Sequence, residues 1–282
     1  MQKKSDDMKI LIADSGSTKT DWALVGNGET EHIGTQGISP IHQQTDVIRS
    51  ILDKELSVEG NPDKVFFYGS GCTPLHIPTM KSLLQQRFPS AAIQVESDLL
   101  GAAHALCGRN EGIASILGTG ANSCLYDGDS IVQNTPALGY ILGDEGSGAV
   151  LGRNFINAIF KNPLLADVRD DFLTTQQLTM ADIIQRVYRQ PMGNRFLAST
   201  SIYIGQHLDN PLLRQLVTDN FRQFFKNNIK PYNRPDLPVH FIGSMAHHYR
   251  EQLAEAACSE GFILGQIMHS PMAGLLEYHA VI

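Results

Sequence analysis

Residues 9–25, KILIADSGSTKTDWALV, hold the pattern on which the fold depends. Apolar residues rich in β-branched types occupy both ends, which predicts two strands around a polar turn. A strand–turn–strand needs glycine and short polar residues in any case. The consecutive backbone N–H groups of this turn could equally surround a phosphate, together with the hydroxyls of Ser17, Thr18 and Thr20. The pattern alone leaves both interpretations open.

The composition limits the class of protein. The 282 residues suffice for one large or two ordinary domains, and 42% hydrophobic and 18% charged residues are typical of a globular protein. A formal net charge of -7 argues against a nucleic-acid-binding surface. No apolar run approaches the ~20 residues that cross a bilayer, and the polar first residues lack the apolar core of a secretory signal. We therefore expect a cytoplasmic protein with neither a membrane nor a nucleic-acid partner.

Strand and helix patterns alternate in two successive halves. The first half predicts strands 9–14, 22–26, 30–35, 63–71 and 91–96, with helices 43–58, 77–88 and 98–107. At about residue 111 the pattern restarts as strand, glycine turn and strand, followed by a hairpin signal at Asp127-Gly128. The remainder predicts mostly helix from 147 to 228, a last strand within 237–246, helix 247–261 and a terminal helix. We expect two α/β halves, each a mixed sheet covered by helices, packed around a cleft.

Two further glycine turns follow predicted buried strands. LGTGAN at 117–122 resembles the first turn in composition, and FIGSMA at 241–246 leads from a strand into a helix. Gly243 permits close backbone approach, and a helix N-terminus favours an anionic or polar group. Each turn taken alone is also an ordinary feature of α/β proteins. Two facing phosphate turns would explain why both halves begin alike.

Two aspartates stand at the ends of predicted strands. Asp14 leaves the first strand and is well placed to hold hydrated Mg²⁺, which prefers oxygen ligands. Asp98 lies where strand 91–96 meets helix 98–107. The residues alone favour a helix N-cap there, because Asp and the neighbouring Ser97 are both preferred cap types.

Five segments together resemble one branch of a large superfamily. They are DSGSTKTDW (14–22), ESDLLGAAHAL (96–106), LGTGANS (117–123), LGYILGDEGSGAVLG (138–152) and FIGSMA (241–246). In this order they are similar to the actin/Hsp70/sugar-kinase superfamily, and within it to the BadF/BadG/BcrA/BcrD ATPase family in its N-acetylglucosamine kinase branch. The resemblance covers nearly the whole chain, and the fourth segment is its most distinctive part.

This resemblance implies two actin-like, or ribonuclease H-like, domains around a central nucleotide cleft. Residues 1–107 with 268–282 would carry the first phosphate hairpin, and residues 108–267 the second hairpin and the adenosine loop. The implied activity is that of an ATP-dependent phosphotransferase with an alcohol acceptor, acting on an amino sugar, with N-acetylglucosamine converted to its 6-phosphate. ATP and Mg²⁺ would be required, and the relatives imply a cytoplasmic homodimer.

The resemblance also assigns roles to single residues. Asp98 aligns with the catalytic base, and Asp14 with the acidic residue of the first hairpin, where the metal would bind. The sugar would contact Asn122, Asp144 and the segment Ala137, Leu138 and Gly139. The nucleotide would contact the two hairpins and the adenosine loop, at Gly16, Ser17, Thr18, Lys19, Gly118, Thr119, Gly120, Gly243, Ser244 and His248.

One departure from the family pattern leaves the sugar open. Relatives place a sugar-contacting asparagine in the loop after the third strand, whereas this loop reads GISPIH at 37–42. Ser39 or Ile41 takes the place of that asparagine. N-acetylglucosamine, glucosamine, N-acetylmannosamine and a muramyl sugar are therefore all candidate substrates.

Three other functions use the same fold. An ATPase that activates a 2-hydroxyacyl-CoA dehydratase would share an iron–sulfur cluster between two subunits. The four cysteines here are far apart and form no CxxC pair, which predicts reduced thiols instead. A sugar- and ATP-binding sensor would need no catalytic base, and an actin-like filament would need no sugar segment.

Overall fold

The computed structural model describes residues 8–16 and 18–280. The chain forms two compact units: unit 1 comprises Met1–Gly108 and Pro271–Ile282, and unit 2 comprises Arg109–Ser270. Each unit contains a mixed five-stranded sheet flanked by helices, which confirms the predicted α/β class. None of the helices in the described ranges is long and apolar enough to span a bilayer.

The sheet of unit 1 has the strand order β3-β2-β1-β4-β5. The strands are β1 (Ile10–Ser15), β2 (Lys19–Gly26), β3 (Glu29–Gln36), β4 (Lys64–Gly69) and β5 (Ala92–Ser97). β1 runs antiparallel to β2 and parallel to β4, and β4 runs parallel to β5. Because side chains alternate between the faces of a strand, Leu11 and Ala13 enter one core while Ile12 enters another.

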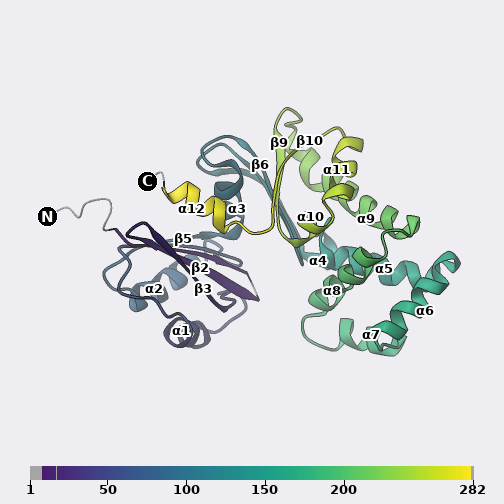
Figure 1. Cartoon of the computed structure of the whole chain (residues 1–282), viewed down its shortest axis with the longest axis horizontal. Helices are drawn as coiled ribbons and strands as arrows, with labels where there is room; N and C mark the ends of the chain where they lie inside the picture. The colour runs from purple at the N-terminus through teal and green to yellow at the C-terminus, as the bar shows by residue number, and fades with distance from the viewer. Residues whose placement is uncertain (1–7, 17, 281–282) are drawn as a thin grey trace. The chain divides into compact units, whose positions relative to one another are not determined.

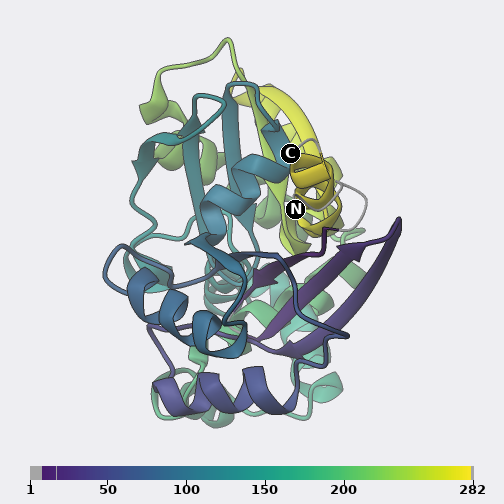
Figure 2. The same ribbon diagram turned by 90° about the vertical axis from the view of Figure 1, so that its left-hand side faces the viewer.

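Helices cover both faces of this sheet (Figures 1 and 2). α1 (Thr45–Lys54) and α2 (Ile77–Arg87) pack on the face of Leu11, and the helical spacing of Ile48, Ile51 and Leu52 gives α1 its buried side. α12 (Met272–Ala280) packs beside α3 (Asp98–Cys107) and brings its Leu275 to the opposite core.

The sheet of unit 2 repeats the same topology in the order β10-β9-β6-β7-β8. Its strands are β6 (Gly112–Leu117), β7 (Ala121–Tyr126), β8 (Ile131–Thr135), β9 (Pro238–Ile242) and β10 (Ile263–Met268). β6 runs antiparallel to β7 and parallel to β9, and β9 runs parallel to β10. The pattern that restarts at residue 111 is therefore a repeat of topology.

Unit 2 also holds most of the helices, as the sequence predicts for residues 147–228. They are α4 (Gly139–Leu142), α5 (Gly148–Lys161), η2 (Pro163–Leu165), α6 (Ala166–Thr175), α7 (Met180–Tyr188), α8 (Gly193–Gln206), α9 (Pro211–Phe224), η3 (Phe225–Ile229), η4 (Lys230–Tyr232), α10 (Ser244–His248) and α11 (Arg250–Ser259). η3 is a π-helix that continues directly from α9. The core of the unit is rich in aromatic rings, among them Phe155, Phe172 and Phe241.

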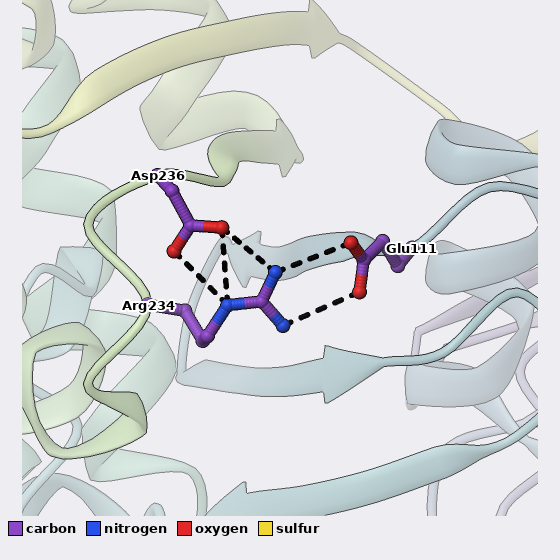
Figure 3. Close-up of polar contacts among 3 residues, drawn as sticks. All are labelled: Glu111, Arg234 and Asp236. Atoms are coloured by element: carbon purple, nitrogen blue, oxygen red, sulfur yellow. Dashed lines mark hydrogen bonds and ion pairs between the residues drawn. The ribbon is translucent and has the colours of Figure 1, made fainter.

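A charged cluster ties the starts of two parallel strands together (Figure 3). The Arg234 guanidinium donates to both carboxylate oxygens of Glu111 at 3.2 Å, from the residue before β6. Its Nε and a terminal nitrogen donate to Asp236, two residues before β9, at distances down to 2.8 Å. The cluster closes the end of the sheet opposite to the glycine turns.

The C-terminal part of the prediction is wrong in two places. β9 is the last buried strand, but the half-buried strand β10 follows it at the sheet edge where the sequence predicts none, and the predicted single helix 247–261 is two helices, α10 and α11. β10 reads ILGQIM, and its Gly265 and Gln266 break the apolar run. Its residues are half-buried or exposed without alternation, so no period-two pattern signals a strand.

Candidate functional site

The functional residues gather where parallel strands end. In unit 1 the last residues of β1, β4 and β5, namely Ser15, Gly69 and Ser97, pair in one row across the sheet. Asp14 precedes this row and Asp98 follows it directly. In α/β proteins ligands bind outside the carboxyl ends of parallel strands, so both aspartates stand where chemistry is expected.

The first hairpin is tighter than predicted, since β2 begins at Lys19. The turn is closed by the Gly16 N–H, which donates to Lys19 O at 3.0 Å. Thr18 and Lys19 are exposed and available to a ligand. Ser17, a predicted nucleotide contact, lies outside the described residues.

The expectation that the Thr20 hydroxyl faces a phosphate is wrong. Thr20 is fully buried, and its Oγ1 lies 2.6 Å from Ser15 Oγ. It also accepts from the Ile38 N–H at 3.2 Å. Thr20 alternates with its exposed neighbours along β2 and therefore points into unit 1, where it holds the loop after β3.

Asp14 and Asp98 form an electrostatically linked pair of half-buried carboxylates. Burial raises the pKa of Asp14 to about 7, with further contributions from the charges of Asp98 and Asp21 and an opposing one from Lys19. Burial likewise raises the pKa of Asp98, against the stabilising N–H of Leu99. Carboxyl groups whose pKa values are raised toward neutrality, at the carboxyl ends of parallel strands, are typical of functional sites.

The N-cap of α3 is Ser97, which corrects the simpler interpretation of Asp98. Ser97 Oγ accepts the Leu100 N–H at 3.2 Å, as a cap does. Asp98 is the first helical residue, and its Oδ1 accepts the Leu99 N–H at 2.9 Å. Asp98 therefore satisfies a backbone donor in the first turn without being the N-cap.

The residues around Asp14 fit a hydrated divalent cation. Two like-charged carboxylates with raised pKa values favour a positive charge between them. The nearest lysine, Lys19, already pairs with Asp21 at 2.8 Å. Within residues 8–16 and 18–280, no three His, Cys, Asp or Glu side chains gather so as to hold a metal ion. Mg²⁺ at Asp14 would therefore keep several waters, as this ion commonly does.

In unit 2 the second hairpin, the start of α5 and the third glycine turn are joined by backbone contacts. The N–H groups of Gly148 and Ala149, at the start of α5, donate to Gly118 O and Thr119 O at 2.8 and 3.1 Å. Gly243 has a φ of +121°, and a Cβ there would lie 2.3 Å from Leu117 O. Only glycine lets the third turn approach the hairpin this closely.

These elements surround a cavity of about 580 Å³ that lies entirely within unit 2. One wall is α8, whose Ala198 faces the start of α5: a Cβ added at Gly148 would lie 3.2 Å from the Ala198 Cβ. The C-terminal part of α8 faces Tyr249, the residue between α10 and α11, since a Cβ at Gly205 would lie 3.3 Å from its hydroxyl. The cavity is lined by Gly118, Thr119, Gly148, Arg195, Ala198, Ser199, Ser201, Ile202, Gly205, Leu208, Ser244, Met245, His248 and Tyr249.

Four of the predicted nucleotide contacts line this cavity: Gly118, Thr119, Ser244 and His248. Sequence reasoning missed the wall supplied by α8 and Tyr249. Arg195 is the one lining residue with a permanent charge, and Ile202 offers an apolar side chain that is 68% exposed. No local motif marks these positions, because they are single residues on the outward side of an ordinary amphipathic helix.

Two of the predicted sugar segments flank α4, with residues 137–139 at its start and Asp144 after its end, while Asn122 is on β7. Asp144 is buried, and a Cβ at Gly120 would lie 3.1 Å from its Oδ2, so its carboxylate rests against the second hairpin. Burial raises the pKa of Asp144 to about 6, opposed by the N–H groups of Ala121 and Gly139 and reinforced by the charge of Glu145. This carboxylate is shielded from solvent yet lies beside the cavity's hairpin.

Asn122 and the segment 137–139 differ in what they can offer a ligand. Asn122 Oδ1 already accepts from the Ser123 N–H at 3.0 Å and from Asn134 Nδ2 at 2.9 Å, which leaves its amide N–H groups as donors. Ala137 O accepts the Asp144 N–H at 2.9 Å, which closes a loop around α4. Leu138, the next residue along the chain, is 64% exposed.

The chain is similar in sequence and structure to several solved proteins. A crystal structure from Porphyromonas gingivalis, named "Putative N-acetylglucosamine Kinase", is 49% identical with a TM-score of 0.90, covering 96% of this chain and 98% of that chain. A protein of the same name from Chromobacterium violaceum is 18% identical with a TM-score of 0.69, covering 97% and 99%. MreB 5 of Spiroplasma citri, bound to AMPPNP, is 10% identical with a TM-score of 0.60, covering 99% and 96%.

The last two similarities show the fold alone, which is that of the actin-like ATPases. No protein-family model and no curated protein matches the sequence. The first similarity goes further, because it joins high identity to nearly complete coverage of both chains. The chain belongs to the same family as the Porphyromonas gingivalis protein named a "Putative N-acetylglucosamine Kinase".

Proposed function

We propose that the protein is an ATP-dependent kinase that phosphorylates an amino sugar, and that its substrate is N-acetylglucosamine, converted to the 6-phosphate. The observation that carries the proposal is the 49% identity to a relative with that name, over 96% of the chain. The carboxylate pair at the strand ends of unit 1 and the cavity beside the second hairpin of unit 2 support it. We further propose the N-acetylglucosamine kinase branch of the BadF/BadG/BcrA/BcrD family, a homodimer and a cytoplasmic location.

The cavity of unit 2 suits a nucleoside. The residues from Ala198 to Gly205 on α8 span about 10 Å at the rise of an α-helix, from the glycine hairpin to Tyr249. In our proposal the phosphates lie at Gly118, Thr119 and Arg195, and the adenosine lies between Ile202 and Ser244. The first hairpin would add the Thr18 hydroxyl and the Lys19 N–H, because the Gly16 N–H already donates to Lys19 O within the turn.

Asp98 is the proposed base. As the 6-hydroxyl oxygen of the sugar attacks the γ-phosphorus, the bond to ADP breaks and Asp98 accepts the hydroxyl proton. A carboxyl group with a raised pKa is a stronger base than a solvated one, which suits this transfer. Asp14 would hold Mg²⁺, which neutralises phosphate charge when bound. Most of the rate would come from positioning and charge neutralisation.

The sugar is proposed to bind at Asp144, at the amide of Asn122 and along 137–139. A carboxylate and an amide donor suit a ligand with many hydroxyls, because each can make hydrogen bonds in a partly dry site. In the loop after β3, Ser39 is buried while Ile41 is 47% exposed. Of the two residues that take the place of the family asparagine, Ile41 is therefore the one that a sugar could touch.

The proposal is tested by a coupled assay of ADP release across hexoses and amino sugars. We expect N-acetylglucosamine to give the highest kcat/KM and expect no turnover without Mg²⁺. Release of ADP that no sugar accelerates would contradict the kinase and favour a sensor or activator. Cys72, Cys107 and Cys124 are buried within their units, and Cys258 is exposed. We accordingly expect the purified protein to be colourless, whereas an iron–sulfur activator would be brown.

A further inference from the structure

The turn that carries Asp144 is held from behind by the end of α9. Asn220 is buried, and its Oδ1 accepts the Gly146 N–H at 3.3 Å while its Nδ2 donates to Ser147 O at 3.2 Å. One asparagine side chain thus satisfies two backbone groups of the turn. The position of residues 144–147 is consequently set by a helix that is distant in sequence.

A second contact, at Glu145, comes from the π-helix η3. Asn227 Nδ2 donates to Glu145 Oε1 at 2.8 Å, and Asn228 Nδ2 donates to Glu145 Oε2 at 3.3 Å. In an α-helix adjacent side chains point about 100° apart, so two neighbours seldom reach one carboxylate. The wider turn of a π-helix brings successive side chains closer in direction, and such turns are frequent at functional sites.

Asp144 needs this support because its backbone is in a costly conformation. Its φ is +54°, in the left-handed region that residues other than glycine rarely adopt. Conformations of this kind persist only where the surrounding structure holds them. The Asp144 N–H is fixed on Ala137 O at 2.9 Å, and Glu145 is the next residue along the turn.

We propose that Glu145, held by Asn227 and Asn228, is a positioning residue that orients the Asp144 carboxylate toward the hydroxyls of the sugar, an inference that rests on the proposed kinase function. Glu145 itself needs no contact with the substrate. Its carboxylate oxygens are both occupied by asparagine amides, so it acts on the sugar through the turn. Loss of these two hydrogen bonds would weaken the binding of the sugar and leave the nucleotide cavity intact.

Asn227 offers a clean test because it is exposed and lies outside the core. Asn227→Ala removes one donor to Glu145, and Asn227→Asp places a like charge against it at nearly constant size. Lys226→Ala is the matched control: Lys226 is the exposed neighbour on the same π-helix, and its Nζ pairs with Glu260 at 3.4 Å instead. Steady-state kinetics with N-acetylglucosamine and with ATP, together with thermal melting, are measured for all three variants and the wild type.

We expect the KM for the sugar to rise about fivefold in Asn227→Ala, the effect of one lost hydrogen bond, and further in Asn227→Asp. The KM for ATP and the melting temperature should match those of Lys226→Ala. Sugar KM values equal to that of Lys226→Ala would overturn the positioning role while leaving the kinase proposal standing. A fall in melting temperature together with a rise in the KM values for both sugar and ATP would also overturn it, because it would show that the contact is merely structural. A wild type that phosphorylates none of the amino sugars would contradict the kinase proposal and this inference with it.

Discussion

Ser97 and Asp98 are adjacent, and the sequence alone does not decide which of them is the N-cap of α3. Both are good N-cap residues, and nothing in the local pattern decides which one caps α3. The structure gives the cap to Ser97, whose Oγ accepts the Leu100 N–H, and leaves Asp98 as a half-buried acid. The chemical role of a single residue depends on neighbours that are distant in sequence. Only the family resemblance, and not the local pattern, therefore indicates that Asp98 is catalytic. Asp14 shows the same: burial raises its pKa, and so does the charge of Asp98, which follows β5 on the far side of β4.

The roles of these two neighbours can be separated by substitution. Asp98→Asn keeps an acceptor for the Leu99 N–H but removes the base, so kcat should fall by about 10²–10⁴-fold with little change in stability. Ser97→Ala should do the reverse, costing about 1 kcal/mol of unfolding free energy through the lost cap. Thermal melts and ADP release on both variants decide the matter. An Asp98→Asn protein with wild-type kcat would end the catalytic assignment.

The raised pKa of Asp14 predicts that the charged carboxylate destabilises the native protein. In the fold the carboxyl has a pKa of about 7, against 3.8 for an unperturbed aspartate. As pH rises from 4 toward 7, the unfolded chain releases this proton before the native protein does, so native stability falls. In metal-free buffer, Asp14→Asn should therefore raise the melting temperature, and by more at pH 8 than at pH 5.

A suitable control is Asp46→Asn, whose exposed carboxylate pairs with Arg49. It should show no such gain at pH 8. An Asp14→Asn variant that melts below the wild type at pH 8 would mean that the Asp14 charge is compensated within the fold.

At the scale of elements, prediction from sequence succeeded where the pattern is local and failed where it is not. The opening hairpin, α1 and α3 follow from apolar spacing and turn residues. β10 was missed because it lies at a sheet edge, where half-buried residues carry no alternation. The α8 wall of the cavity was missed for another reason: helix α8 is recognisable, but which elements its exposed side faces depends on the packing of the unit.

The third glycine turn yields a prediction at this scale. Gly243→Ala places a Cβ 2.3 Å from Leu117 O at a φ of +121°, so the turn must move away from the second hairpin. The backbone strain alone should cost about 1–3 kcal/mol of unfolding free energy, and nucleotide affinity should fall as Ser244 shifts. Gly118→Ala serves as the control for folding, since a Cβ there meets nothing within 4 Å. Denaturant unfolding that gives equal stabilities for the two variants would contradict the close approach.

At the scale of the whole molecule, the chain uses one topology twice. Both sheets order their strands alike, with an antiparallel hairpin first and two parallel strands after it. The sequence carried this repeat only as a pattern of strand, glycine turn and strand, because topology can repeat while side chains diverge. In our proposal the two copies have different roles: unit 1 supplies the carboxylates Asp14 and Asp98, and unit 2 supplies the cavity and Asp144.

The most direct test of the kinase proposal is identification of the product. The full-length protein is incubated with ATP, Mg²⁺ and N-acetylglucosamine, ADP is quantified, and the sugar is analysed by phosphorus and proton NMR. The account predicts one sugar 6-phosphate for each ADP formed by the wild type, and almost none with Asp98→Asn. ADP formed without any phosphorylated sugar, or phosphate on a hydroxyl other than the 6-hydroxyl, would contradict it.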